Sequence, residues 1–228
     1  MAEGERILIA DDHPLMRSAL RHAVAQGLPG CEVTEVGTLD AAADALRAAP
    51  ADRPFDLVLL DLAMPGASGL AGLFLLRAEF PSTAVVIVSA NEDPATIRRA
   101  ADCGAAGFIP KSTLADRIVE AVRAVMRGEF WFETLERGDA TAGRGEDAAL
   151  AVRLASLTPQ QFRVLVAITE GKLNKQIAHE LGVGEATVKA HVTEILRKQG
   201  VISRTQAAIA ARELLAGPAG AGSQPEPA

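Results

Sequence analysis

Short runs of apolar residues alternate with amphipathic segments along the first 130 residues of this 228-residue chain. The amphipathic segments repeat apolar positions at helical spacing, as Leu20 and Val24 do, and predict helices. The apolar runs are bounded by charged or turn residues, which is typical of strands buried on both faces. This alternation predicts a doubly wound α/β domain built on a five-stranded parallel sheet. The predicted strands are residues 6–10, 33–36, 57–61, 84–88 and 107–109.

The pattern changes after residue 150, where apolar residues recur only at helical spacing and predict a small domain of four helices. Between the two domains, residues 137–147 are rich in Gly, Ala and charge and show no periodicity, so they predict a flexible linker. The expected organisation is an α/β domain at 5–127, a linker at 128–152, a helical domain at 153–216 and a disordered tail at 217–228.

Charge is distributed unevenly between the two predicted domains. Residues 1–130 carry 12 Lys and Arg against 18 Asp and Glu, whereas residues 151–216 carry 9 against 5. We therefore expect only the second domain to meet a polyanion such as nucleic acid. The chain contains no apolar run of membrane-spanning length and no secretory signal, and its two cysteines are far apart. These features predict a cytoplasmic protein without a membrane partner.

Polar residues follow four of the predicted strands. Right-handed crossovers bring the carboxyl ends of parallel strands to one edge of the sheet, so these residues should lie together. Three carboxylates would form an oxygen-rich site suited to Mg²⁺, and Asp61 could accept a phosphoryl group. Lys111 and Ser89 could then bind phosphoryl oxygens. The strand-end residues are Asp11, Asp12, Asp61, Ser89 and Lys111.

The sequence around these residues resembles the receiver domain of two-component response regulators. The resemblance rests on the Asp11-Asp12 pair, the D-x-x-M-P-G-x-x-G run at 61–69, Ser89-Ala90, and the G-F-I-P-K run at 107–111. It implies that Asp61 is the phosphoacceptor and that Ser89 and Lys111 contact the phosphoryl group. It also implies four contributors to a Mg²⁺ site, with Asp11 acting through water and Ala63 through its carbonyl: Asp11, Asp12, Asp61 and Ala63.

Two neighbouring side chains leave alternatives open. Phe108 matches the switch aromatic of that family and could turn inward on phosphorylation, but it lacks the hydroxyl that a Tyr would have. His13, next to the acidic pair, could be a metal ligand, although we favour a solvent-facing turn residue.

Residues 174–198 show the helix, Gly-containing turn and helix of a helix-turn-helix, whose second helix enters the major groove. The runs L-T-P at 157–159, G-K-L-N-K-Q-I-A at 171–178, T-V-K-A-H at 187–191 and S-R-T-Q-A at 203–207 resemble the LuxR-type output domain. The resemblance implies a recognition helix at 185–199 and a dimerisation surface on the last helix. Cations and outward residues in these segments suit DNA contacts. The expected DNA-binding set is Lys175, Thr187, Lys189, Ala190, His191, Thr193, Arg197 and Arg204.

The output segment departs from the family pattern at two positions. Gln161 stands where Glu is usual, which could remove an internal ion pair. Gln199 stands where Leu is usual, which places a polar group at a normally apolar position.

Together, the two resemblances indicate a response regulator of the NarL/FixJ class that controls transcription. A sensor histidine kinase would phosphorylate Asp61, and the chain would then dimerise on double-stranded DNA. We also hypothesise that the unphosphorylated receiver covers the recognition helix or the last helix. Two other functions stay open: a DNA-binding protein that ignores phosphorylation, and a phosphatase with Asp61 as nucleophile. The phosphatase is disfavoured because such enzymes usually carry an acid where this chain has Ala63.

Overall fold

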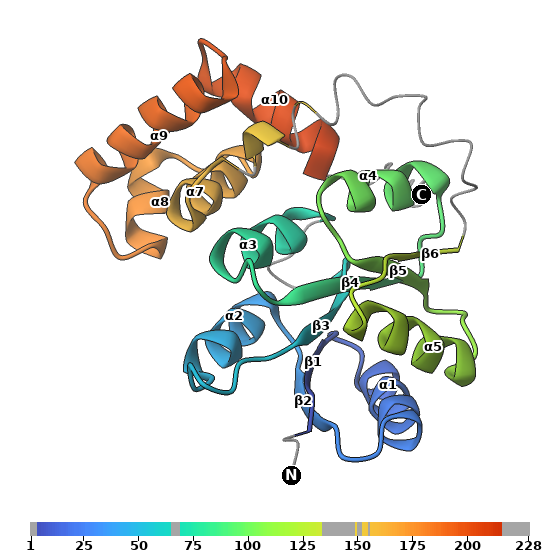
Figure 1. Cartoon of the computed structure of the whole chain (residues 1–228). Coiled ribbons are helices and arrows are strands. Elements are labelled where there is room, and N and C mark those ends of the chain that lie inside the picture. Colours follow the sequence, from blue (N-terminus) through green and yellow to red (C-terminus); the bar gives the residue numbers. More distant parts are fainter. Residues whose placement is uncertain (1–3, 65–68, 134–148, 150–151, 155, 216–228) are drawn as a thin grey trace, which may run out of the picture.

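The N-terminal domain is a parallel sheet of six strands with helices on both faces (Figure 1). This computed structural model describes residues 4–64, 69–133, 149, 152–154 and 156–215. The strand order is β2-β1-β3-β4-β5-β6, and every pairing is parallel. The strands are β1 (Arg6–Ala10), β2 (Glu32–Val36), β3 (Leu57–Asp61), β4 (Ala84–Ser89), β5 (Gly107–Pro110) and β6 (Trp131–Phe132).

The helices form a layer on each face of this sheet (Figure 1). Alternate residues of each strand face opposite sides, so Ile7 and Ile9 of β1 pack toward one layer while Leu8 packs toward the other. Burial on both faces explains why the strands read as unbroken apolar runs. The first layer holds α1 (Pro14–Gly27) and α5 (Ala115–Met126); the second holds α2 (Leu39–Ala48), α3 (Ala71–Glu79) and α4 (Pro94–Asp102).

The prediction of five strands is wrong by one, because Trp131 and Phe132 add β6 at the edge. These two residues lie in the segment that we expected to be linker. They pair closely with β5, and a Cβ added to Gly107 would approach the Trp131 carbonyl oxygen to 2.9 Å. The side chain of Trp131 also packs beneath the Arg117 guanidinium. Residues 137–147 and the predicted tail lie outside the described residues.

The C-terminal domain is helical, as expected, with its own apolar interior. Thr158 opens α7 with a capping box in which its side chain accepts from the Gln161 N–H. Phe162, Ile177, Val188 and Ile195 are buried where the helices meet. The helices are α7 (Pro159–Thr169), α8 (Asn174–Glu180), α9 (Glu185–Gln199) and α10 (Arg204–Leu215).

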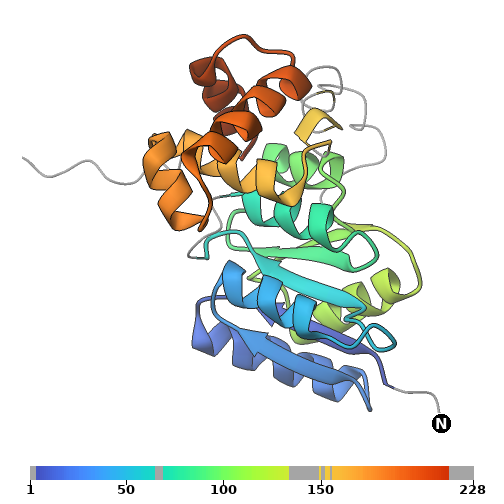
Figure 2. The same cartoon turned by 90° about the vertical axis from the view of Figure 1, so that its left-hand side faces the viewer.

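The two domains meet where α3 packs on α7, and their apolar side chains form one continuous cluster (Figures 1 and 2). Phe74 of α3 stacks on Phe162 of α7. At the rim, Glu79 pairs with Arg47 of α2 and with Arg163 of α7, where Arg163 Nη2 lies 3.4 Å from Glu79 Oε2. The contact with α3 is thus made by α7, and α9 lies away from the receiver, so the first alternative of our hypothesis, a covered recognition helix, is wrong for this structure (Figure 1). The second alternative, a covered last helix, stays a prediction.

Candidate functional site: an acidic pocket and an exposed helix

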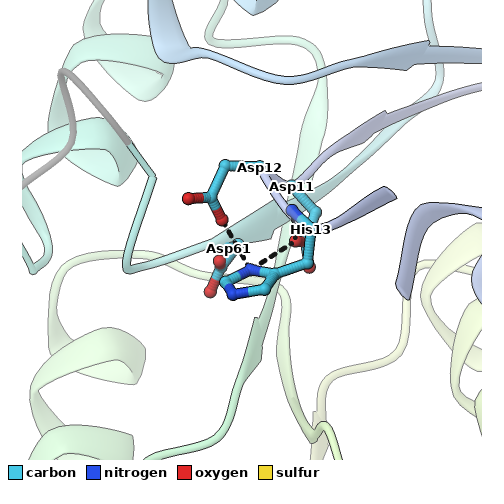
Figure 3. A group of neighbouring side chains, drawn as sticks. All are labelled: Asp11, Asp12, His13 and Asp61. Atoms are coloured by element: carbon cyan, nitrogen blue, oxygen red, sulfur yellow. Dashed lines mark hydrogen bonds and ion pairs between the residues drawn. The ribbon is translucent and has the colours of Figure 1, made fainter. Parts of the chain in front are cut away.

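The acidic residues lie at the point where the strand order reverses. The chain leaves β1 for β2 on one side and returns to β3 on the other, so the ends of β1 and β3 flank a topological switch point. Open α/β sheets bind ligands at such points, beyond the carboxyl ends of the strands. Asp11 and Asp12 follow β1, and Asp61 is the last residue of β3. The predicted convergence of the three carboxylates is confirmed (Figure 3).

Lys111 links the two buried carboxylates of this cluster. Its Nζ lies 2.8 Å from Asp11 Oδ2 and 2.9 Å from Asp61 Oδ2, and both aspartates are 1 % exposed. Burial on its own lowers the pKa of Lys111, but the hydrogen bonds that Lys111 donates to Asp11 and Asp61, with the charges of these carboxylates, outweigh burial and leave that pKa above its usual value. Lys111 is therefore a fixed positive charge beside Asp61.

The cluster still carries more negative than positive charge. Three carboxylates face one lysine, and the ligand atoms of the group lie within 4.8 Å of one another. Concentrated carboxylate oxygens with surplus negative charge suit a hard divalent cation. The donor set therefore fits Mg²⁺.

The other predicted residues of this site surround an open pocket of about 510 Å³. Ser89 ends β4 and is buried; its Oγ accepts a hydrogen bond from the Asn91 N–H at 3.1 Å. Asp61, Ala63, Ser89 and Lys111 all line the pocket, so the fold brings a carboxylate, an ammonium group and a hydroxyl to one opening.

Phe108 and His13 differ from their sequence-based expectations. The Phe108 ring is already buried at 2 % exposure, so this structure has no outward ring that could turn inward. His13 is exposed, as a turn residue would be, yet its imidazole points into the acidic cluster and pairs with Asp11 and Asp12 (Figure 3). Only its position next to the acidic pair hinted at this in the sequence.

The outward face of α9 carries most of the predicted DNA-binding residues. Thr187, Lys189, Ala190, Thr193 and Arg197 are exposed, and His191 is half-buried. Lys189 pairs with Glu185 at 3.1 Å and Arg197 with Glu194 at 2.9 Å, but exposed pairs of this kind are weak and open readily to phosphate. Lys175 is exposed on α8 and has no ion pair among the described residues.

Arg204 has a structural role that its sequence position did not reveal. Its guanidinium donates to Asn174 Oδ1 at 2.7 Å and to the Lys172 carbonyl, which ties the start of α10 to the start of α8. Burial lowers the pKa of Arg204. Two of the guanidinium nitrogens of Arg204 are therefore engaged in hydrogen bonds within the domain.

The two departures from the family pattern are both buried. Gln161 Oε1 accepts from Lys198 Nζ at 2.8 Å and from the Thr158 N–H at 3.1 Å, so the chain has a hydrogen bond to Lys198 where the Glu usual in the family could form an ion pair. Gln199 is 3 % exposed, and its Nε2 has no hydrogen-bond partner among the described residues.

No helix in the described part of the chain is both long and apolar enough to cross a membrane.

Two family matches divide the chain. Residues 7–123 match the response regulator receiver domain, and residues 155–211 match the bacterial regulatory proteins of the luxR family.

Relatives match over nearly the whole chain. The glycerol metabolism activator of Pseudomonas putida is 42 % identical over 92 % of this chain and 96 % of its own length. The transcriptional regulatory protein LiaR of Bacillus subtilis is 32 % identical over 90 % of this chain and 95 % of its own. The nitrate/nitrite response regulator NarL of Escherichia coli is 32 % identical over 91 % and 94 %.

Solved structures share the fold. RcsB of Salmonella enterica serovar Typhimurium, bound to promoter P1flhDC with the phosphomimetic BeF₃⁻, superposes with a TM-score of 0.51 at 21 % identity, over 91 % of this chain and 97 % of that chain. A structure of two RcsB dimers on two parallel DNAs gives a TM-score of 0.52, also at 21 % identity, over 91 % and 97 %. The acidic pocket, the exposed helix and these matches agree: the chain belongs to the two-component response regulators with a LuxR-type DNA-binding domain, which are transcriptional regulators.

Proposed function

We propose that Asp61 accepts the phosphoryl group from a sensor histidine kinase and that this controls binding of the helical domain to DNA. The observation that carries the proposal is the pair of contacts from Lys111 Nζ to Asp11 and Asp61 at the mouth of an open pocket. A carboxylate oxygen of Asp61 forms the new bond to phosphorus while the bond from phosphorus to the kinase imidazole breaks. The electron pair of that bond stays with the imidazole nitrogen.

The surrounding residues would bind the metal ion and the phosphoryl oxygens. Asp11, Asp12, Asp61 and the Ala63 carbonyl would hold Mg²⁺, which neutralises charge on the phosphoryl oxygens when bound. Lys111 stabilises a further phosphoryl oxygen, and Ser89 offers its hydroxyl after leaving the Asn91 N–H.

Paired output domains would then read DNA. Lys175 and the exposed residues of α9 contact phosphates and bases, and a homodimer would place two recognition helices on half-sites about one helical turn apart. RcsB, which shares this fold, has been solved as dimers on DNA, and this supports the homodimer.

Labelling by acetyl phosphate tests the assignment. We expect wild-type protein with Mg²⁺ to gain one phosphoryl group by intact-protein mass spectrometry, and Asp61→Asn to gain none while keeping its circular dichroism spectrum. Undiminished labelling of Asp61→Asn would refute Asp61 as the acceptor. Rapid turnover of many phosphate esters would favour the phosphatase, and equal operator affinity with and without label would favour regulation that ignores phosphorylation.

A further inference from the structure

The imidazole of His13 stands among the carboxylates at the separations expected of neighbouring metal ligands (Figure 3). Its Nδ1 lies 2.6 Å from Asp12 Oδ1 and 3.3 Å from Asp11 Oδ1. Two adjacent ligands of an octahedral ion, each at about 2.1 Å, are about 3 Å apart. A cation bound between these atoms could therefore replace the direct contacts of His13 with Asp11 and Asp12 after small shifts of the imidazole ring.

The backbone holds His13 in this position. Its N–H donates to Asp11 Oδ1 at 2.7 Å, and Pro14 begins α1 directly after it. The side chain is 65 % exposed, whereas Asp11 and Asp61 are 1 % exposed. Asp11 and Asp61 are thus confined by packing, while Asp12 and the imidazole keep room to adjust.

Nitrogen and oxygen ligands select different cations. Mg²⁺ prefers oxygen ligands and keeps several waters, so it has little use for an imidazole. Imidazole suits Co²⁺, Ni²⁺ and Zn²⁺, which nitrogen-containing sites bind more tightly than Mn²⁺ or Fe²⁺. A group of three carboxylates and one imidazole is a complete mixed donor set for such an ion.

We propose that His13 is a nitrogen ligand for divalent transition-metal ions at this site and that Mg²⁺ uses the same carboxylates without it. The inference rests on the metal site of the proposed function and adds a residue that sets its ion selectivity. Replacing His13 then weakens binding of Co²⁺ relative to Mg²⁺ and leaves the Mg²⁺ site in place.

The test compares full-length His13→Asn with His22→Asn, a matched control at an exposed histidine of α1, the helix that begins directly after His13. Co²⁺ affinity is measured from the visible absorption of the bound ion, and Mg²⁺ affinity by calorimetry, both at pH 7.5. We expect His13→Asn to lose at least about tenfold in Co²⁺ affinity, the lower end of what losing even a supporting partner causes. Its Mg²⁺ affinity should be unchanged, the Co²⁺ spectrum should shift, and His22→Asn should behave as wild type.

Three other results are decisive. Equal Co²⁺ affinity and spectra in the two variants would refute His13 as a ligand. Equal losses for Co²⁺ and Mg²⁺ would refute selectivity and indicate general damage to the site. A third result would separate the two proposals: His13→Asn loses Co²⁺ affinity, but Mg²⁺ binding is not detected for wild type or for any variant. His13 would then be confirmed as a Co²⁺ ligand, and the magnesium site of the proposed function would be refuted.

Discussion

Phe74 of α3 and Phe162 of α7 stack with their ring centroids 5.6 Å apart and their planes at 30°. The rings come from different domains, and both are nearly inaccessible to solvent. Aromatic pairs of this geometry contribute about 0.5–1.5 kcal/mol beyond the area they bury. The stack and the nearby Glu79–Arg163 pair therefore hold the output domain through α7, while the outward face of α9 stays exposed.

The domain contact predicts a separation between docking and DNA reading. Phe74→Ala should loosen the contact and raise the radius of gyration measured by small-angle X-ray scattering. Affinity for a single DNA half-site should not change, because docking does not cover α9. Phe130→Ala, which replaces a 76 % exposed phenylalanine of the same domain, is the control for both measurements.

The masking hypothesis predicts a different result for Phe74→Ala. Release of a covered recognition helix would raise half-site affinity by about 5- to 150-fold, the usual range of coupling between sites. An increase of that size would show that docking hinders DNA binding after all. An unchanged radius of gyration would show that the Phe74 ring does not hold the domains together.

Lys175 and Arg204 should separate DNA contact from domain stability. Lys175→Ala should weaken binding about equally for all sequences and lower the salt slope by roughly one unit, since one phosphate contact is lost. Its melting temperature should match wild type because Lys175 is exposed. Arg204→Ala should lower the melting temperature even without DNA, because Asn174 and the Lys172 carbonyl lose a charged donor. DNA affinity is measured by fluorescence anisotropy and stability by thermal melts. A lowered melting temperature for Lys175→Ala together with an unchanged one for Arg204→Ala would refute the two assignments.

Gln199 predicts a stabilising substitution in the output domain. Its buried Nε2 has no partner among the described residues, and an unsatisfied buried polar group costs about 1–3 kcal/mol. Gln199→Leu should therefore increase the free energy of unfolding in urea by about 1 kcal/mol or more. The bond from Arg153 to the carbonyl of residue 199 is retained, because it involves only the backbone at that position. A destabilised Gln199→Leu would show that the pocket requires the amide.

Cys31 predicts a pH-dependent reactivity. Partial burial, followed by the charges of Glu5, Asp56 and Glu32, raises the pKa of its thiol from 9.0 to about 11. At pH 8, the native thiolate fraction should be roughly 100-fold below that of the unfolded chain, because each pKa unit is a factor of ten. Alkylation by iodoacetamide, followed by peptide mass spectrometry, should be slower in buffer than in urea by at least that ratio.

The same pKa shift fixes the direction of a stability effect. The unfolded thiol loses its proton near pH 9, whereas the native thiol keeps its proton until about pH 11. The contribution of Cys31 to stability is therefore present below pH 9 and declines between these values. Cys31→Ser should remove this part of the alkaline loss, and an identical pH profile would refute the assignment.

The acidic site could be predicted from sequence because its geometry follows from local signals and one general rule. Asp11 and Asp61 each end a short apolar run, and parallel strands with right-handed crossovers bring such ends together. The helix-turn-helix was equally readable, since the periodicity of α8 and α9 and the turn between them are contiguous in the chain.

Other features depended on residues far apart in sequence. Trp131 and Phe132 are too few to show a period, and their pairing with β5 exists only once the sheet has formed. Phe74 and Phe162 are both buried, but no local pattern says that they meet across 88 positions. The sequence determined which residues are buried and which strands end in carboxylates, because these follow from local patterns. Tertiary packing alone decided that α7 is the docking face and that Arg204 bonds within its own domain, because these depend on contacts between separate elements.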